Sequence, residues 1–324
     1  MRFPLLRCPG TLAFLDDERH YLETLALVLP RELVCHFFLK PQSFVNRIRS
    51  EAFAWEQEKL IITGITNSWL QSDRSESLLP KYLSSFFSGE RRFDLTTTIV
   101  VDYAMPAMDG LKVLRELAAW PGRRILMTGM ADERIAVEAF NQGLIDQYIP
   151  KQAPDALVRM LGAFSRFEED ASRQRGELLR ATLGAEQLQL LSEPAVAQAL
   201  GKFVREQNWV EYMVIGQPFG ILGADTAGEL HWLQLETTQS VQDLSQMLHT
   251  AGWSESWVRQ VASGERLADL ELQNSLGHTQ RAQLLPSIRL CESPVVFAGL
   301  VKLDEQVPGY RDFSDRFAER NIII

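Results

Sequence analysis

Short apolar runs alternate with amphipathic helical patterns along the first half of the chain. Such alternation is typical of βαβ units, so it predicts a parallel sheet covered by helices. The helical patterns occupy residues 18–29, 110–120 and 132–143, where apolar positions recur every three or four residues. We therefore expect a doubly wound sheet of five parallel strands, at residues 11–17, 33–39, 96–102, 123–129 and 146–150.

Residues 41–92 interrupt this alternation with some fifty residues that lack a strand-like segment. Their apolar content is too high for a disordered linker, so we expect a mostly helical insertion. One interpretation is a helical pair that only covers the sheet. The other is a docking or dimerisation surface, and the pattern alone does not choose between them.

The second half has a different pattern. A helical stretch, residues 166–208, predicts a linker, and residues 209–324 alternate between strand-like and helical segments. Strands at hairpin spacing are predicted at 211–216, 219–225 and 229–236, and a helix at 240–252. This indicates an α+β domain with an antiparallel sheet, whose strand–turn–strand segment resembles that of a PAS-like sensor.

Length and composition fit two soluble domains. The chain has 324 residues, of which 46% are hydrophobic and 23% charged, and no apolar run approaches the roughly 20 residues that cross a bilayer. The three cysteines are widely spaced, which favours a reduced, cytoplasmic protein without a membrane association. Nearly all of the net charge of -9 lies in residues 165–324, which argues against a DNA-binding surface there.

Acidic residues stand at the ends of two predicted parallel strands. Asp16 and Asp17 end the first strand and Asp102 ends the third, while Thr128 lies at the end of the fourth and Lys151 follows the fifth. Ligands of such sheets collect at the carboxyl ends of the strands. Three converging carboxylates repel one another unless a cation lies among them, and hard oxygen ligands suit Mg²⁺. A lysine and a hydroxyl nearby could hold the other oxygens of a phosphoryl group.

These segments resemble the receiver domain of two-component response regulators, a CheY-like, flavodoxin-like fold. The matching pieces are FLDDE, IVVDYAMPAMDG, ILMTG and YIPK, in this order. Thr128 lies 26 residues after Asp102, and Lys151 lies 23 after Thr128, as in the family. The resemblance assigns residues 1–165 to a receiver domain with the 41–92 insertion.

The resemblance implies a role for each matching residue. Asp102 would accept a phosphoryl group from a sensor histidine kinase or a phosphotransfer protein. Asp16, Asp17, Asp102 and the backbone carbonyl of Ala104 would hold Mg²⁺, and Lys151 would pair with the phosphoryl oxygens. The receiver would catalyse only its own phosphotransfer and dephosphorylation, so we do not expect an enzyme acting on other substrates.

The same resemblance implies a switch. Thr128 would move to hydrogen-bond a phosphoryl oxygen, and Tyr148 would turn inward as it does so. Two departures from the family stand out. Pro150 precedes Lys151, where the family usually has proline directly after the lysine, and 85 residues separate Asp17 from Asp102, about twice the usual number.

A competing interpretation is a haloacid-dehalogenase-type phosphohydrolase, which also forms an aspartyl phosphate with Mg²⁺. Such enzymes need a second acid two residues after the nucleophile as general acid and base. That position is Ala104 here. An aspartyl phosphate at Asp102 should therefore persist as a signal.

The second half carries no familiar output signature. It has no basic recognition helix, no Walker A loop, and no metal-ligand spacing among His231, His249 and His278. One hypothesis is a protein-interaction or ligand-sensing module with an unknown protein partner. The alternative is a divergent transcriptional regulator whose C-terminal domain binds DNA. The sequence does not give the oligomeric state, and a homodimer is among the assemblies it allows.

Overall fold

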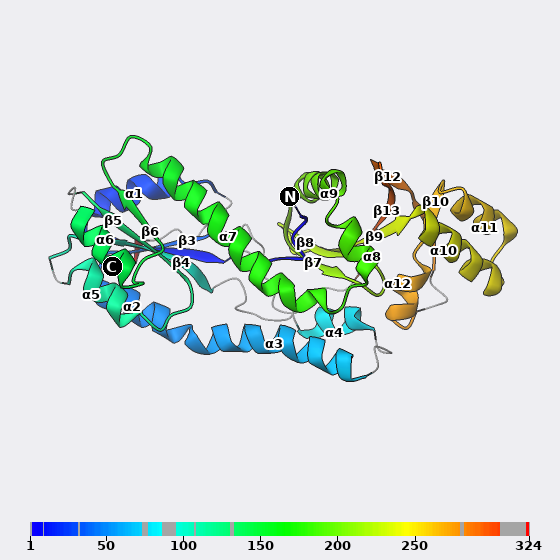
Figure 1. Cartoon of the computed structure of the whole chain (residues 1–324), viewed down its shortest axis with the longest axis horizontal. Coiled ribbons are helices and arrows are strands. Elements are labelled where there is room, and N and C mark those ends of the chain that lie inside the picture. Colours follow the sequence, from blue (N-terminus) through cyan, green and yellow to red (C-terminus); the bar gives the residue numbers. More distant parts are fainter. Residues whose placement is uncertain are drawn as a thin grey trace. The chain divides into compact units, whose positions relative to one another are not determined.

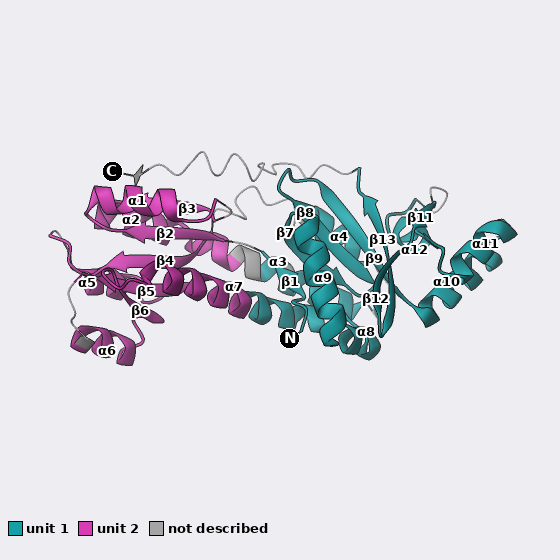
Figure 2. Cartoon of the chain, turned by 90° about the horizontal axis from the view of Figure 1, so that it is seen from above, with its two compact units in different colours: residues 1–8, 60–90, 172–310 teal, residues 9–59, 91–171, 311–324 magenta. Residues whose placement is uncertain are grey.

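The computed structural model describes residues 2–8, 10–31, 33–72, 77–85, 95–106, 108–129, 133–278, 282–304 and 322–323. The chain forms two compact units (Figure 2). Residues 9–59, 91–171 and 311–324 make up the receiver-like unit, and residues 1–8, 60–90 and 172–310 make up the second unit. Each unit has its own sheet.

The receiver-like unit contains the predicted five parallel strands. They are β2 (Thr11–Leu15), β3 (Cys35–Phe38), β4 (Thr96–Asp102), β5 (Arg123–Thr128) and β6 (Gln147–Pro150). A short strand near the end of the chain, β14 (Ile322–Ile323), pairs in parallel with β3 and extends the sheet to the order β14-β3-β2-β4-β5-β6. The expected fold class is confirmed, with one edge strand more than the sequence predicted.

Helices cover both faces of this sheet (Figure 1). Alternate residues of each strand enter different apolar clusters, as the two-residue period of a strand requires. Buried side chains of α1 (Arg19–Val28) and α7 (Ala156–Arg180) pack on one face. Those of α2 (Pro41–Ser50), α5 (Gly110–Glu116) and α6 (Glu133–Asn141) pack on the other.

The 41–92 stretch is helical, as expected, but it does not belong to one domain. Its helices are α2, α3 (Ala52–Gln71) and α4 (Leu78–Ser85). Only α2 and the start of α3 fall in the receiver-like unit. Trp69, Leu78 and Tyr82 are almost fully buried in the core of the second unit, because their apolar surface faces that sheet. Residues 73–76 and 86–92 of this stretch lie outside the described part of the chain.

The second unit is built on an antiparallel sheet of order β1-β7-β8-β9-β13-β12. Its strands are β1 (Leu6–Arg7), β7 (Trp209–Ile215), β8 (Gly220–Asp225), β9 (Leu230–Thr237), β12 (Ile288–Glu292) and β13 (Val295–Lys302). A separate two-stranded sheet joins β10 (Arg266–Ala268) to β11 (Leu284–Pro286). The remaining helices are α8 (Ala185–Leu190), α9 (Pro194–Glu206), α10 (Thr238–Thr250), α11 (Glu255–Ala262) and α12 (Leu270–Ser275). The expected α+β class is confirmed.

The observed units correct two of the expected boundaries. Residues 1–8 were expected in the receiver domain, but Leu6 is fully buried in the core of the second unit and β1 pairs with β7. Residues 166–208 were expected as a linker. They instead contain the end of α7 and the helices α8 and α9, whose residues Leu200 and Phe203 pack on the second sheet. The second unit therefore starts before residue 209 and includes the first residues of the chain.

Among the described helices, none combines the length and the apolar composition that a bilayer crossing requires.

Candidate functional site

Three carboxylates meet where β2 and β4 end. The two strands pair in parallel, with Leu15 opposite Val101, so Asp16 and Asp102 leave the sheet side by side. Asp17 joins them, and one carboxylate oxygen from each of the three residues lies within 4.8 Å of the others. Asp16 and Asp102 are 3% and 4% exposed, whereas Asp17 is exposed. The acids predicted to converge therefore do so.

Lys151 contacts two of these acids. Its Nζ lies 2.6 Å from Asp16 Oδ2 and 2.9 Å from Asp102 Oδ1, and its side chain is 13% exposed. The residue directly follows β6, and its backbone N–H donates to the carbonyl of Thr128 at 2.9 Å. The unusual placement of Pro150 does not prevent the lysine from reaching the carboxylates.

Burial and charge act against each other in this group. Burial raises the pKa of Asp16 to about 6, although its hydrogen bond to Lys151 and the lysine's positive charge lower it. Burial lowers the pKa of Lys151, but the hydrogen bond to Asp16 and the charges of Asp16 and Asp102 outweigh it, so this pKa lies above its ordinary value. The lysine is therefore held as a cation, and one positive charge faces three acids.

The loop after Asp102 is tightly folded against it. A Cβ on Gly110 would lie 2.2 Å from the carbonyl oxygen of Asp102, so only glycine fits at this position. The Gly110 N–H donates to the carbonyl of Tyr103 at 2.9 Å. Asp109 caps α5 by accepting a hydrogen bond from the Lys112 N–H at 2.8 Å. Asp109 and Gly110 thus place the start of α5 directly beside the carbonyl of Asp102.

The two predicted switch residues lie on one face of the sheet. Thr128 ends β5 and is 3% exposed. Tyr148 on β6 is opposite Leu126, two residues before Thr128, so Thr128 and Tyr148 share the face covered by α5 and α6. Tyr148 is half-buried against that apolar cluster. Their placement is compatible with a coupled movement.

The group fits a divalent cation. Asp102 Oδ1 is buried and lies 2.9 Å from Lys151 Nζ, and a carboxylate oxygen can accept from more than one partner. Asp16, Asp17 and Asp102 offer the hard oxygen ligands that Mg²⁺ takes. Ala104, whose carbonyl was predicted as a further ligand, lies in the exposed part of the same loop.

In the second unit, His231 belongs to another group of side chains that could bind a metal ion. Asp225, Glu229 and His231 approach within the same limit of 4.8 Å. Their side chains already have partners: His231 Nε2 lies 3.1 Å from Asp225 Oδ2, and Glu229 Oε1 lies 2.6 Å from Lys302 Nζ. His231 is therefore a hydrogen-bonded imidazole within the second unit.

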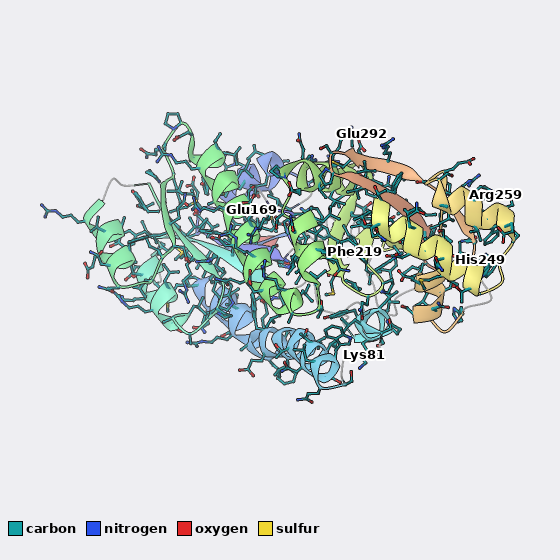
Figure 3. All side chains as sticks on the ribbon, turned by 45° about the vertical axis from the view of Figure 1, so that its right-hand side comes forward. Lys81, Glu169, Phe219, His249, Arg259 and Glu292 are labelled. Carbon is teal, nitrogen blue, oxygen red and sulfur yellow. The ribbon has the colours of Figure 1, made fainter. Side chains whose placement is uncertain are left out.

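His249 is a surface residue. It lies in the last turn of α10 (Figure 3) and pairs with Glu255 at 3.2 Å.

Sequence reasoning missed Tyr21, which lies beside the carboxylates. Lys151 Nζ is 4.8 Å from the centre of its ring, and its hydroxyl is 3.8 Å from Met127 Sδ. Burial raises the pKa of Tyr21, and the nearby charges of Asp16 and Asp102 add to this. The sequence signal that could have found it is its position in the first turn of the helix after the acid pair.

No protein-family model matches the sequence, and no curated protein matches it. Among solved structures, the response regulator LqsR of Legionella pneumophila is 22% identical, covers 98% of this chain and 97% of its own, and has a TM-score of 0.65. The CheY-like receiver domain protein of Methanospirillum hungatei is 16% identical, with 50% and 98% coverage and a TM-score of 0.31. The Mg²⁺–BeF complex of Thermotoga maritima TrrA is 17% identical, with 48% and 98% coverage and a TM-score of 0.28. The match over nearly the whole chain shows that this chain shares its fold with the Legionella response regulator.

Proposed function

We propose that the chain is a response regulator of a phosphorelay, in which Asp102 accepts a phosphoryl group and the second unit transmits the signal. The observation that carries this proposal is the placement of Lys151, whose Nζ lies 2.6 Å from Asp16 and 2.9 Å from Asp102 beside the exposed Asp17. A structural ion pair would need one acid. Three acids around one lysine leave negative charge that suits a metal ion.

The proposed reaction transfers a phosphoryl group from a histidine nitrogen to a carboxylate oxygen of Asp102. An Asp102 carboxylate oxygen attacks the phosphorus of a phosphohistidine on a sensor kinase or phosphotransfer protein. The P–N bond breaks, its electron pair stays on the imidazole, and an acyl phosphate remains on Asp102. Mg²⁺, when bound by Asp16, Asp17, Asp102 and the Ala104 carbonyl, supplies neutralising charge. Lys151 is placed to neutralise a phosphoryl oxygen, since its ammonium already contacts Asp102.

The proposed readout is a movement of Thr128 and Tyr148. A phosphoryl oxygen offers the Thr128 hydroxyl a charged acceptor, and charge-assisted hydrogen bonds are stronger than neutral ones. Movement of Thr128 would change the space beside Tyr148, because both side chains lie on the α5 and α6 face. Ala104 supplies no general acid or base, which supports a persistent acyl phosphate and not a hydrolase.

We further propose that the second unit acts on a protein partner or a small ligand, in the cytoplasm. Its acidic charge supports this, since a polyanion such as DNA would be repelled. A gel-shift assay with genomic fragments at low and high salt tests the choice. Salt-sensitive binding of DNA by the purified protein would contradict the protein-partner proposal and favour the transcriptional alternative.

Labelling with acetyl phosphate and Mg²⁺ tests the receiver function. The wild type should gain one phosphoryl group, and Asp102→Asn should gain none. Asp109→Asn is the matched control, because it changes an acid of the same loop and asparagine caps helices as well as aspartate does. Equal labelling of Asp102→Asn and the control would mean that Asp102 is not the acceptor.

A further inference from the structure

Tyr21 is the one aromatic side chain that the described contacts place against the candidate lysine. Its ring centre lies 4.8 Å from Lys151 Nζ, within the roughly 6 Å over which a cation is attracted to an aromatic ring. The ring is fixed at both ends. Its backbone belongs to the first turn of α1, and its hydroxyl lies 3.8 Å from the Sδ of Met127, a buried residue of β5.

Among the described residues, three side chains contact the Lys151 ammonium, and they are of two chemical kinds. Asp16 and Asp102 are carboxylates, and Tyr21 is an uncharged ring. The two carboxylates are also the proposed Mg²⁺ ligands, so their oxygens cannot serve the lysine and a metal ion equally. The ring does not bind Mg²⁺, since that ion takes oxygen ligands. The attraction between the Tyr21 ring and the Lys151 ammonium therefore does not depend on whether Asp16 and Asp102 bind a metal ion.

We infer that Tyr21 is a positioning residue, which holds the Lys151 ammonium beside Asp102 when Asp16 and Asp102 engage a metal ion. This inference rests on the proposed phosphoryl-acceptor function. The ring keeps the ammonium next to the position that a phosphoryl group on Asp102 would occupy. Without the ring, the freed ammonium would turn toward solvent and contribute less to binding that group.

The test uses two variants of the full chain. Tyr21→Leu removes the ring and keeps apolar volume, whereas Tyr21→Phe keeps the ring and loses only the hydroxyl. Calorimetric titration with beryllofluoride in excess Mg²⁺ measures the affinity for a phosphoryl analogue. Tyr21→Leu should bind about two- to thirtyfold more weakly than the wild type, the range expected for one cation–π contact. Tyr21→Phe should stay within about twofold, because it keeps that contact.

A nuclear magnetic resonance measurement on the wild type does not depend on the variants folding. The ring should shift the signals of the Lys151 side-chain protons upfield, and the shift should persist when Mg²⁺ and beryllofluoride are added. Loss of the shift on addition would overturn the inference, as would equal affinities of wild type and Tyr21→Leu. An equal loss of affinity in both variants would also overturn it, because the hydroxyl and not the ring would then be responsible.

The outcome also separates this inference from the function it rests on. If the wild type does not bind beryllofluoride, the phosphoryl-acceptor proposal fails, and the role of Tyr21 fails with it. If the wild type binds and Asp102→Asn does not, the acceptor proposal stands, and the two Tyr21 variants alone decide the inference.

Discussion

Several buried carboxylates among the described residues have raised pKa values, and two of them, Asp16 in the receiver-like unit and Glu236 in the second unit, can be compared directly. In the receiver-like unit, burial raises the pKa of Asp16 to about 6, and in the second unit burial raises that of Glu236 to about 7. Both side chains are almost fully buried. Their partners differ in kind: Asp16 faces the ammonium of Lys151, whereas Glu236 accepts a hydrogen bond from the neutral amide of Gln234 at 2.6 Å.

We propose that this difference separates a reactive group from a structural one. Asp16 shares its lysine with Asp102 and stands next to the exposed Asp17, so solvent and ions reach the group. The Gln234 amide that donates to Glu236 also donates to the carbonyl of Ala268 at 3.1 Å, which joins β9 to β10. Acidic neighbours are present at both sites, since the charges of Glu271 and Asp243 also raise the pKa of Glu236, so the two acids differ in the lysine that faces Asp16.

Removal of the lysine should have the largest effect. Lys151→Met should slow labelling of Asp102 by acetyl phosphate about a hundred- to a thousandfold, the loss typical of one group that stabilises developing charge. Rates of label uptake with excess Mg²⁺ measure it. Lys112→Met is the control, because Lys112 is exposed on α5 and forms its ion pair with Asp109, outside the group around Asp102. A rate near that of the control would contradict the role of Lys151.

The second-largest effect concerns Glu236 and pH. Its pKa is about 7 when folded and 4.5 ordinarily, so the folded chain binds the proton more tightly. This contribution to the free energy of unfolding is fully present below about pH 4.5 and is lost as pH rises through about 7, and it amounts to about 3 kcal/mol at most. Urea unfolding across this range should show a smaller decline for Glu236→Gln than for the wild type. Glu265→Gln, at an exposed glutamate of the same unit, should behave as the wild type does, and an unchanged decline in Glu236→Gln would refute the assignment.

A smaller effect is expected from the exposed acid. Asp17→Asn should weaken Mg²⁺ binding about thirtyfold, since one negative charge and a divalent cation 4 Å apart in water attract each other by ~2 kcal/mol. Stability without Mg²⁺ should not fall, because Asp17 is exposed and has acidic neighbours. Mg²⁺ titration followed by thermal unfolding measures both. Glu18→Gln, a change at the adjacent exposed acid, should leave Mg²⁺ affinity as in the wild type, and equal affinities in all three proteins would remove Asp17 from the site.

The smallest effect on labelling is expected at Thr128. Thr128→Ala should accept the phosphoryl group at about the wild-type rate, because its hydroxyl is proposed to respond to the group and not to transfer it. The change in the Tyr148 ring signals on labelling should disappear in Thr128→Ala and persist in Thr128→Ser. Ring signals that still change in Thr128→Ala would uncouple Tyr148 from Thr128.

The receiver sheet and its acids were predictable for a physical reason. Parallel strands with β-branched residues have a strong sequence pattern, and their carboxyl ends meet at one edge whatever covers their faces. Asp16, Asp102 and Lys151 therefore lie together as the sequence predicted.

What the sequence did not reveal depends on packing between distant segments. Trp69 and Tyr82 are apolar residues of ordinary helices, and only the sheet of the second unit determines where they are buried. The role of Tyr21 could not be predicted for the same reason, because a tyrosine in an amphipathic helix usually packs in a core. Its contact with Lys151 requires the end of β6 to lie beside α1, which no local pattern encodes.

The most direct test of the central claim is to locate the label. The wild type would be treated with acetyl phosphate and Mg²⁺, digested, and mapped by tandem mass spectrometry after conversion of the acyl phosphate to a stable derivative. The account predicts a single modified residue, Asp102. A modification on another residue, or none in a protein shown to be folded and to bind Mg²⁺, would contradict it.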